Sequence, residues 1–259
     1  MLSITIPRKF IEAVSRFFSR RNGEFLIGRI ALISAAFATG YLYIRQEIVT
    51  YGDAESHLNI AKRVVDSLTP GAAQLGGIWL PLPHILLAPF VYFDALWRTG
   101  LAGSIVSGVA YIVTAIFIYR IVLFLTTQRA AAVVGAFVFL WNPNVLYLQG
   151  TPMTELPLIV FFTLSTYYLV RFLRGEQITH LVAAAFFGFC AALSRYDGWF
   201  LIGIETMVLA AKYVPWERVP HRASELWTLF RRERWQKMEG VVIVFATLAF
   251  FSVALWLMW

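Results

Sequence analysis

Charged residues are scarce in this sequence, and cysteine is nearly absent. Only 14% of the 259 residues are charged, whereas 59% are hydrophobic and 16% are aromatic. A water-soluble domain of this length needs more charge to cover its surface, so the composition excludes that class. The single Cys190 excludes an internal disulfide. The abundant apolar residues, with a mean hydropathy of +0.68, instead predict an integral membrane protein of the helical kind.

The net charge of +7 does not indicate a nucleic-acid partner, because the basic residues are dispersed among loops between apolar segments. In membrane proteins, the distribution of basic residues among the loops indicates which loops face the cytoplasm. Residues 1–24 are basic and amphipathic, and they predict a helix on the cytoplasmic surface of the membrane. A secretory signal peptide is the alternative, which we disfavour because the basic region is long and Arg29 would interrupt its apolar core.

The apolar runs predict an all-α, polytopic membrane protein with about seven transmembrane helices. Candidate spans lie at residues 25–44, 101–125, 130–148, 156–170, 181–194, 199–211 and 241–259. Several are shorter than the roughly 20 residues of a straight crossing. A further run at 81–94 is apolar for about a dozen residues, a length typical of an interfacial segment. The chain stops inside an apolar run, "VALWLMW", so we expect it to be the N-terminal part of a longer protein.

The order of the charged loops predicts which side of the membrane each loop faces. With a cytoplasmic N-terminus and no crossing at 81–94, the basic loops at 120–129, 171–174 and 212–238 all lie in the cytoplasm, as the positive-inside rule favours. A crossing at 81–94 would invert every one of them. The external loops then carry four acids that could converge on one site: Asp53, Glu55, Glu155 and Asp197.

The first external loop, residues 45–100, predicts two interfacial helices. Asp53 follows Gly52 in a position suited to a helix N-cap. Leu58, Ala61, Val65 and Leu68 then recur at helical spacing before "TPG" ends the helix. Pro81 and Pro83 begin a second, more apolar helix.

The acids of these loops have both structural and functional interpretations. Asp53 and Glu55 form a D-x-E pair that could bind a divalent cation such as Mg²⁺ or Mn²⁺, but the first could instead cap its helix and the second complement the helix dipole. Glu155, after "GTPMT", begins a predicted span, where an acid also favours the dipole. Glu205 lies inside a predicted span and is expected to face protein or water.

The basic residues and histidines of these loops also have more than one interpretation. Lys62 and Arg63 lie on the polar side of the first interfacial helix, where contact with lipid headgroups is the default interpretation. Arg195 could neutralise a phosphate or simply pair with Asp197 in a turn. His57 and His84 could act as ligands or hydrogen-bond donors, although neither belongs to a metal-binding motif.

The order of these features resembles the GT-C superfamily of membrane glycosyltransferases, and within it the protein O-mannosyltransferase-like enzymes. The shared features are the long acidic first outer loop, the "WLPLPH" motif, the acid after "NP" and the external "RYD" turn. The resemblance implies inverting transfer of a sugar from a polyprenyl-phosphate donor on the outer face of a cell or inner membrane. It also implies that Asp53 is the catalytic carboxylate, with Glu55 as its neighbour, and that Glu155 is the second-loop acid. The chain departs from the family in having Asp53-Ala54-Glu55 in place of adjacent acids, and "LPLP" in place of adjacent prolines.

The residue chemistry is compatible with that reaction. A carboxylate base assists an acceptor hydroxyl of a glycan, lipid or protein, and Arg195, Lys62 or a metal could neutralise the departing lipid phosphate. Two alternatives remain open: a secondary transporter, favoured only by Glu205, and a lipid-binding membrane subunit without catalysis.

Overall fold

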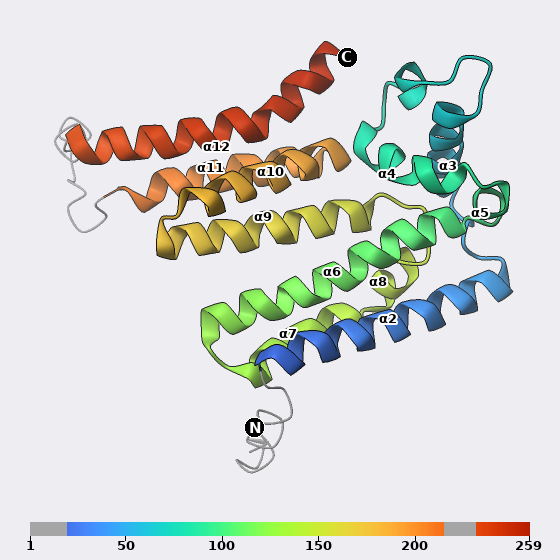
Figure 1. Cartoon of the computed structure of the whole chain (residues 1–259), viewed down its shortest axis with the longest axis horizontal. Helices are drawn as coiled ribbons and strands as arrows, with labels where there is room; N and C mark the ends of the chain where they lie inside the picture. The colour runs from blue at the N-terminus through green and yellow to red at the C-terminus, as the bar shows by residue number, and fades with distance from the viewer. Residues whose placement is uncertain (1–19, 215–231) are drawn as a thin grey trace, which may run out of the picture. The chain divides into compact units, whose positions relative to one another are not determined.

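The computed structural model describes residues 20–214 and 232–259, and this part of the chain contains helices and no strands (Figure 1). The predicted amphipathic segment 1–24 and the basic loop 212–238 lie mainly outside the described residues. The helices are α2 (Arg20–Arg45), α3 (Gly52–Val65), η1 (Ala72–Leu75), α4 (Pro81–Val91), α5 (Asp94–Thr99), α6 (Leu101–Thr126), α7 (Arg129–Leu140), α8 (Pro143–Leu148), α9 (Glu155–Gly175), α10 (Ile178–Ser194), α11 (Asp197–Lys212) and α12 (Arg232–Met258).

Four of the described helices are long and apolar enough to cross a membrane, as predicted for an all-helical membrane protein. They are Gly23–Arg45, Leu101–Thr126, Glu155–Gly175 and Trp235–Met258. The other predicted spans form shorter helices. At 1.5 Å per residue, the 17 residues of α10 extend about 25 Å, less than the roughly 30 Å of a bilayer core.

The expected single helix at 130–148 is wrong. Helix α7 ends at Leu140, and α8 begins at Pro143. The Asn142 side chain accepts hydrogen bonds from the amides of Asn144 and Val145, at 3.0 and 3.4 Å, and therefore caps a new helix. Pro143 has no amide hydrogen to continue the α7 ladder, so "NP" breaks the predicted span into two helices.

The chain forms two compact units, residues 1–163 and 164–259, which are described separately. In the first unit α6 packs against α2 and α7. Arg120 of α6 forms an ion pair with Glu24 of α2 at 2.6 Å. In the middle of α6, the Tyr111 hydroxyl donates to the Leu140 carbonyl at 2.7 Å and joins α6 to the end of α7.

The first loop folds onto the start of α6 as α3, η1, α4 and α5 (Figure 1). Leu58 and Ala61 of α3 pack with Leu87 and Val91 of α4 and with Ala102 of α6. The prediction that Pro81 and Pro83 begin a helix is confirmed, because both lie in the first turn of α4.

Two details of the predicted α3 are wrong. The capping residue is Tyr51, and Asp53 lies within the first turn and does not cap the helix. Helix α3 also ends at Val65, so Leu68 lies beyond it with a fully exposed side chain.

The second unit contains α10, α11 and α12 packed against one another, with the C-terminal part of α9. The predicted turn between two short helices at "SRYDGW" is confirmed, because α10 ends at Ser194 and α11 begins at Asp197. A side chain at Gly198 would overlap the Ala191 carbonyl, so glycine permits the close approach of α10 and α11.

Candidate functional site

The first turn of α3 presents two exposed carboxylates. Asp53 and Glu55 are both exposed, whereas Ala54 between them is buried. Among the described residues, no side chain forms a hydrogen bond or ion pair with either carboxylate. Both groups are therefore available to a ligand, and Asp53 is released from the capping role that competed with a catalytic one.

A buried histidine pair, His57 and His84, joins α3 to α4 close to Asp53. His57 lies one helical turn after Asp53, and its Nδ1 lies 3.0 Å from Nε2 of His84. The His57 ring also packs edge-on against Trp79, with centroids 4.9 Å apart. Burial, together with neighbouring His57, lowers the pKa of His84 to about 4. His84 is therefore neutral near pH 7 and serves to position α3.

Lys62 forms ion pairs within the fold that the sequence did not predict. Its ammonium contacts Asp94 of α5 at 2.7 Å and Asp66 at 3.1 Å, and it lies over the Trp97 ring. The hydrogen bond from Lys62 to Asp94 raises the pKa of the ammonium above its ordinary value. Arg63, the next residue, is exposed, so its guanidinium is accessible to an anionic ligand.

The turn that leads to Glu155 is fixed by hydrogen bonds from α6. Ser104 donates to the Gly150 carbonyl at 2.6 Å, and Ser107 donates to the Thr151 carbonyl at 2.9 Å. Two residues after Pro152, Thr154 is buried, and Glu155 then begins α9. These buried hydrogen bonds fix the turn that precedes Glu155 and the start of α9.

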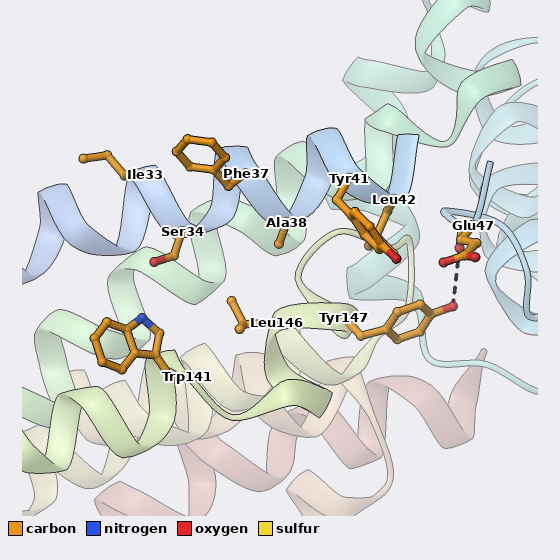
Figure 2. A pocket seen from close by; sticks show the side chains of 10 residues that line it. All are labelled: Ile33, Ser34, Phe37, Ala38, Tyr41, Leu42, Glu47, Trp141, Leu146 and Tyr147. Carbon is orange, nitrogen blue, oxygen red and sulfur yellow. Dashed lines mark hydrogen bonds between the residues drawn. The ribbon is translucent and has the colours of Figure 1, made fainter. Parts of the chain in front are cut away.

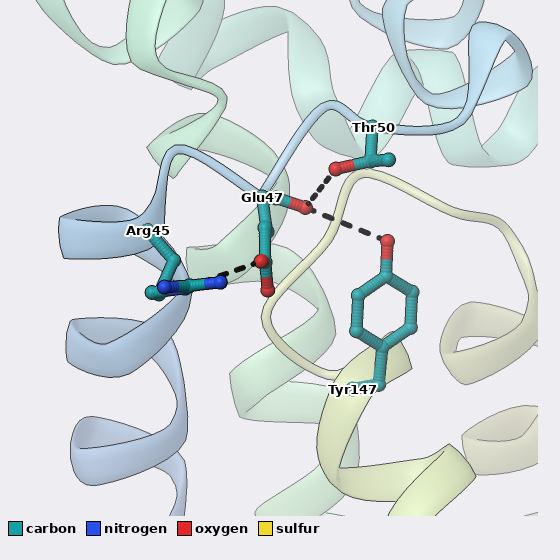
Figure 3. A network of polar contacts seen from close by, with 4 residues as sticks. All are labelled: Arg45, Glu47, Thr50 and Tyr147. Carbon is teal, nitrogen blue, oxygen red and sulfur yellow. Dashed lines mark hydrogen bonds and ion pairs between the residues drawn. The ribbon is translucent and has the colours of Figure 1, made fainter.

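The second loop also contacts the segment that precedes Asp53. Figure 3 shows the Tyr147 hydroxyl donating to the Glu47 carbonyl at 3.4 Å, and the Thr50 hydroxyl donating to the same oxygen at 3.0 Å. The Glu47 carboxylate pairs with Arg45 at 3.3 Å. Tyr51 packs edge-on against Tyr147 with centroids 5.9 Å apart. Both acidic loops therefore lie at the same end of the first unit.

An apolar groove runs along α2 toward this end of the unit (Figure 2). It has a volume of about 660 Å³. Its walls come from α2, α7–α8 and the segment after α2, and the lining residues are Ile33, Ser34, Phe37, Ala38, Tyr41, Leu42, Glu47, Trp141, Leu146 and Tyr147. Glu47 and Tyr147 lie at one end of the groove, so an apolar chain in it would meet polar groups there.

The remaining predicted site residues belong to the second unit. Arg195 Nε lies 3.2 Å from Asp197 Oδ2, and the two form the local ion pair that was one of their two predicted interpretations. Within the first unit, the contacts of Tyr147 with Glu47 and Tyr51 place the second loop beside the segment that leads to Asp53 and Glu55.

Sequence reasoning missed Glu47, Tyr147 and Asp94. None of them lies in a motif, and each acts through a partner 32 or 100 residues away. In residues 20–214 and 232–259, no group of three or more His, Cys, Asp or Glu side chains is arranged to hold a metal ion. Asp53 and Glu55 could supply two carboxylate groups toward the oxygen ligands that Mg²⁺ or Mn²⁺ prefers.

Comparisons with protein-family models, curated proteins and solved structures found no match to this chain.

Proposed function

We propose that the protein is a membrane glycosyltransferase that moves a sugar from a polyprenyl-phosphate donor to an acceptor hydroxyl. One observation carries the proposal: an apolar groove ends at Glu47 and Tyr147, which contact the segment leading to two exposed carboxylates. A donor with an apolar chain and a charged head needs such a combination. The resemblance to the GT-C superfamily supports the same assignment.

In the proposed reaction Asp53 is the general base, with Glu55 beside it. Asp53 takes the proton of the acceptor hydroxyl as the oxygen forms a bond to the anomeric carbon. The bond from that carbon to the phosphate oxygen breaks, and polyprenyl phosphate leaves with the electron pair, so the anomeric configuration is inverted. A positioned carboxylate base contributes roughly 10² to 10⁴ in rate to such a step.

The departing phosphate needs positive charge more than it needs a strong acid. Exposed Arg63 lies on the same helix as Asp53 and can bind the phosphate through two guanidinium hydrogen bonds. Mg²⁺ or Mn²⁺ on Asp53 and Glu55 would supply the same charge. Glu155 is proposed to contact the sugar or phosphate.

The proposed topology has seven spans, with the N-terminus in the cytoplasm and α3 and α4 at the outer interface. The 11 residues of α4 extend only about 16 Å and favour an interfacial position. Glu155 and the α3 acids then face outward, where a glycan, lipid or protein acceptor meets the donor.

The proposal is tested by sugar transfer in membranes that contain the protein. A panel of radiolabelled polyprenyl-phosphate sugars is supplied to native, Asp53→Asn and Asp66→Asn proteins at equal abundance. Asp66 is an exposed acid at the other end of α3, and its contact with Lys62 at 3.1 Å is longer than the Lys62–Asp94 contact at 2.7 Å, which Asp66→Asn leaves in place; the variant therefore controls for loss of negative charge on α3. We expect transfer with at least one donor, a loss of 10²-fold or more for Asp53→Asn, and near-native rates for Asp66→Asn.

Three outcomes would contradict parts of the proposal. Equal transfer by all three proteins removes Asp53 as the base. Equal loss in both variants indicates that charge on α3, and no specific base, matters. The absence of transfer with every donor favours a transporter or a non-catalytic lipid-binding subunit.

A further inference from the structure

Glu205 is a buried carboxyl that the proposed reaction does not use. It lies in the middle of α11 with 3% of its surface exposed. The sequence predicted that it faces protein or water, without identifying a partner. Its Oε2 atom lies 2.7 Å from the hydroxyl oxygen of Ser165 on α9.

The hydrogen bonds around Ser165 indicate whether the Glu205 carboxyl is protonated. Ser165 Oγ lies within hydrogen-bond distance of two oxygens, the Ala184 carbonyl at 2.9 Å and Glu205 Oε2 at 2.7 Å. A serine hydroxyl has one hydrogen and can donate to only one of them. An ionised carboxylate is acceptor-only, so one of the two short contacts would then lack a hydrogen.

A protonated Glu205 satisfies both contacts. The carboxylic acid donates from Oε2 to Ser165 Oγ, and Ser165 donates to the Ala184 carbonyl of α10. The other oxygen, Oε1, is buried and makes no hydrogen bond to the described residues, although Thr166 lies nearby. A neutral C=O tolerates this environment far better than a carboxylate oxygen does.

No cation compensates a negative charge at Glu205 within residues 164–214 and 232–259. On α11 itself, Lys212 is paired with Glu176 at 2.6 Å. No ion pair joins Glu205 to the described ionisable groups of the helices around α11, which are Tyr167, Tyr168, Arg171 and Arg174 of α9, His180 and Cys190 of α10, and Lys237 and Glu239 of α12. A buried ion without a partner is strongly disfavoured, and such groups become neutral instead.

We infer that Glu205 is a stably protonated carboxylic acid whose hydrogen bond joins α11 to α9 and, through Ser165, to α10. Gly188 leaves room for the junction, because a Cβ atom there would lie 3.0 Å from Ile202 Cγ2 and 3.5 Å from Ser165 Oγ. This inference does not depend on sugar transfer. A carboxyl that donates this hydrogen bond does not coordinate a cation, so the transporter alternative requires Glu205 to release its proton during transport.

Infrared spectroscopy of the purified protein in lipid tests the protonation state directly. The difference spectrum between native and Glu205→Gln protein is expected to contain the C=O band of a protonated carboxyl at neutral pH. Glu239→Gln is the control, because Glu239 is exposed and is expected to change only the carboxylate bands. A Glu205 difference in the carboxylate bands alone, or a C=O band lost on raising the pH through neutrality, would overturn the inference and favour the transporter.

A second variant tests the hydrogen bond without removing the acid. In Ser165→Ala the Glu205 hydroxyl loses its acceptor, so the C=O band should persist and shift to higher frequency. An unshifted band would contradict the proposed chain from Glu205 through Ser165 to Ala184. This comparison also remains informative if Glu205→Gln does not fold.

Discussion

Replacement of Gly103 by alanine should displace the turn that carries the second-loop acid. Gly103 lies in the first turn of α6, and a Cβ atom there would overlap the backbone of Pro152. The neighbouring residues Ser104 and Ser107 hold Gly150 and Thr151 through their carbonyls. Because the obstruction is backbone, a side-chain rotation cannot relieve it, and α6 and the turn must separate.

The magnitude follows from three contributions. Overpacking costs about 1 to 3 kcal/mol, and two weakened serine hydrogen bonds cost about 0.5 to 1.5 kcal/mol each. Alanine in a helix recovers about 1 kcal/mol relative to glycine. The net loss is then roughly 1 to 5 kcal/mol, and at about 2 to 4 °C per kcal/mol a central value of about 3 kcal/mol lowers the unfolding temperature by about 6 to 12 °C.

Gly108→Ala is the matched control on the same helix. A Cβ atom at Gly108 would lie 3.6 Å from Gln149 Oε1, an ordinary contact, so only the gain in helix propensity remains. Thermal unfolding of both variants in the same detergent, followed by tryptophan fluorescence, should lower the midpoint for Gly103→Ala and leave it equal or higher for Gly108→Ala. Equal midpoints for the two variants would refute the argument that backbone contact at Pro152 determines the fit of α6.

Three further predictions concern other parts of the chain. Gly198→Ala, which would overlap the Ala191 carbonyl, should lower the unfolding midpoint by several degrees, whereas Gly203→Ala on the same helix has open space and should not; equal effects would contradict the proposed close approach. Because the pKa of His84 falls from 6.5 to about 4 on folding, the unfolded chain binds more protons between these values, and about 3 kcal/mol of stability present above pH 6.5 is lost as the pH falls to 4. Denaturant titrations at pH 6.5 and pH 4 should show this loss of stability, and His84→Gln should reduce it. If the pH dependence of stability is the same in native and His84→Gln proteins, His84 is not a buried neutral imidazole. Ala38→Trp should fill the groove and weaken polyprenyl-phosphate binding, while Val138→Trp, exposed on α7 outside the groove, should not; equal binding by both variants would place the lipid elsewhere.

The predictions that depended on local sequence were mostly correct. Apolar runs became helices, and Pro81 and the "RYD" turn began and separated helices where expected. Local reasoning failed where two signals competed. At 130–148 the apolar run predicted one span, but the Asn142 cap and the missing amide of Pro143 divide it into two helices.

The contacts that position the candidate site could not be predicted, because they join residues far apart in the sequence. His57 and His84 are 27 residues apart, Lys62 and Asp94 are 32 apart, and Ser104 and Gly150 are 46 apart. No spacing rule connects such pairs. Lys62 was therefore interpreted as a headgroup ligand, although the fold uses it to hold α3 against α5.

These three long-range polar contacts lie on the segments that carry the acids of the first unit. Two of them fix α3, one at the His57–His84 pair and one at Lys62, and the serine contacts fix the turn before Glu155. Buried polar pairs add little net stability compared with apolar packing, but they permit only one arrangement of the groups they join. If these positions served packing alone, apolar side chains such as leucine could occupy them. Their position therefore holds the segments that carry the acids in one arrangement, which the proposed reaction requires.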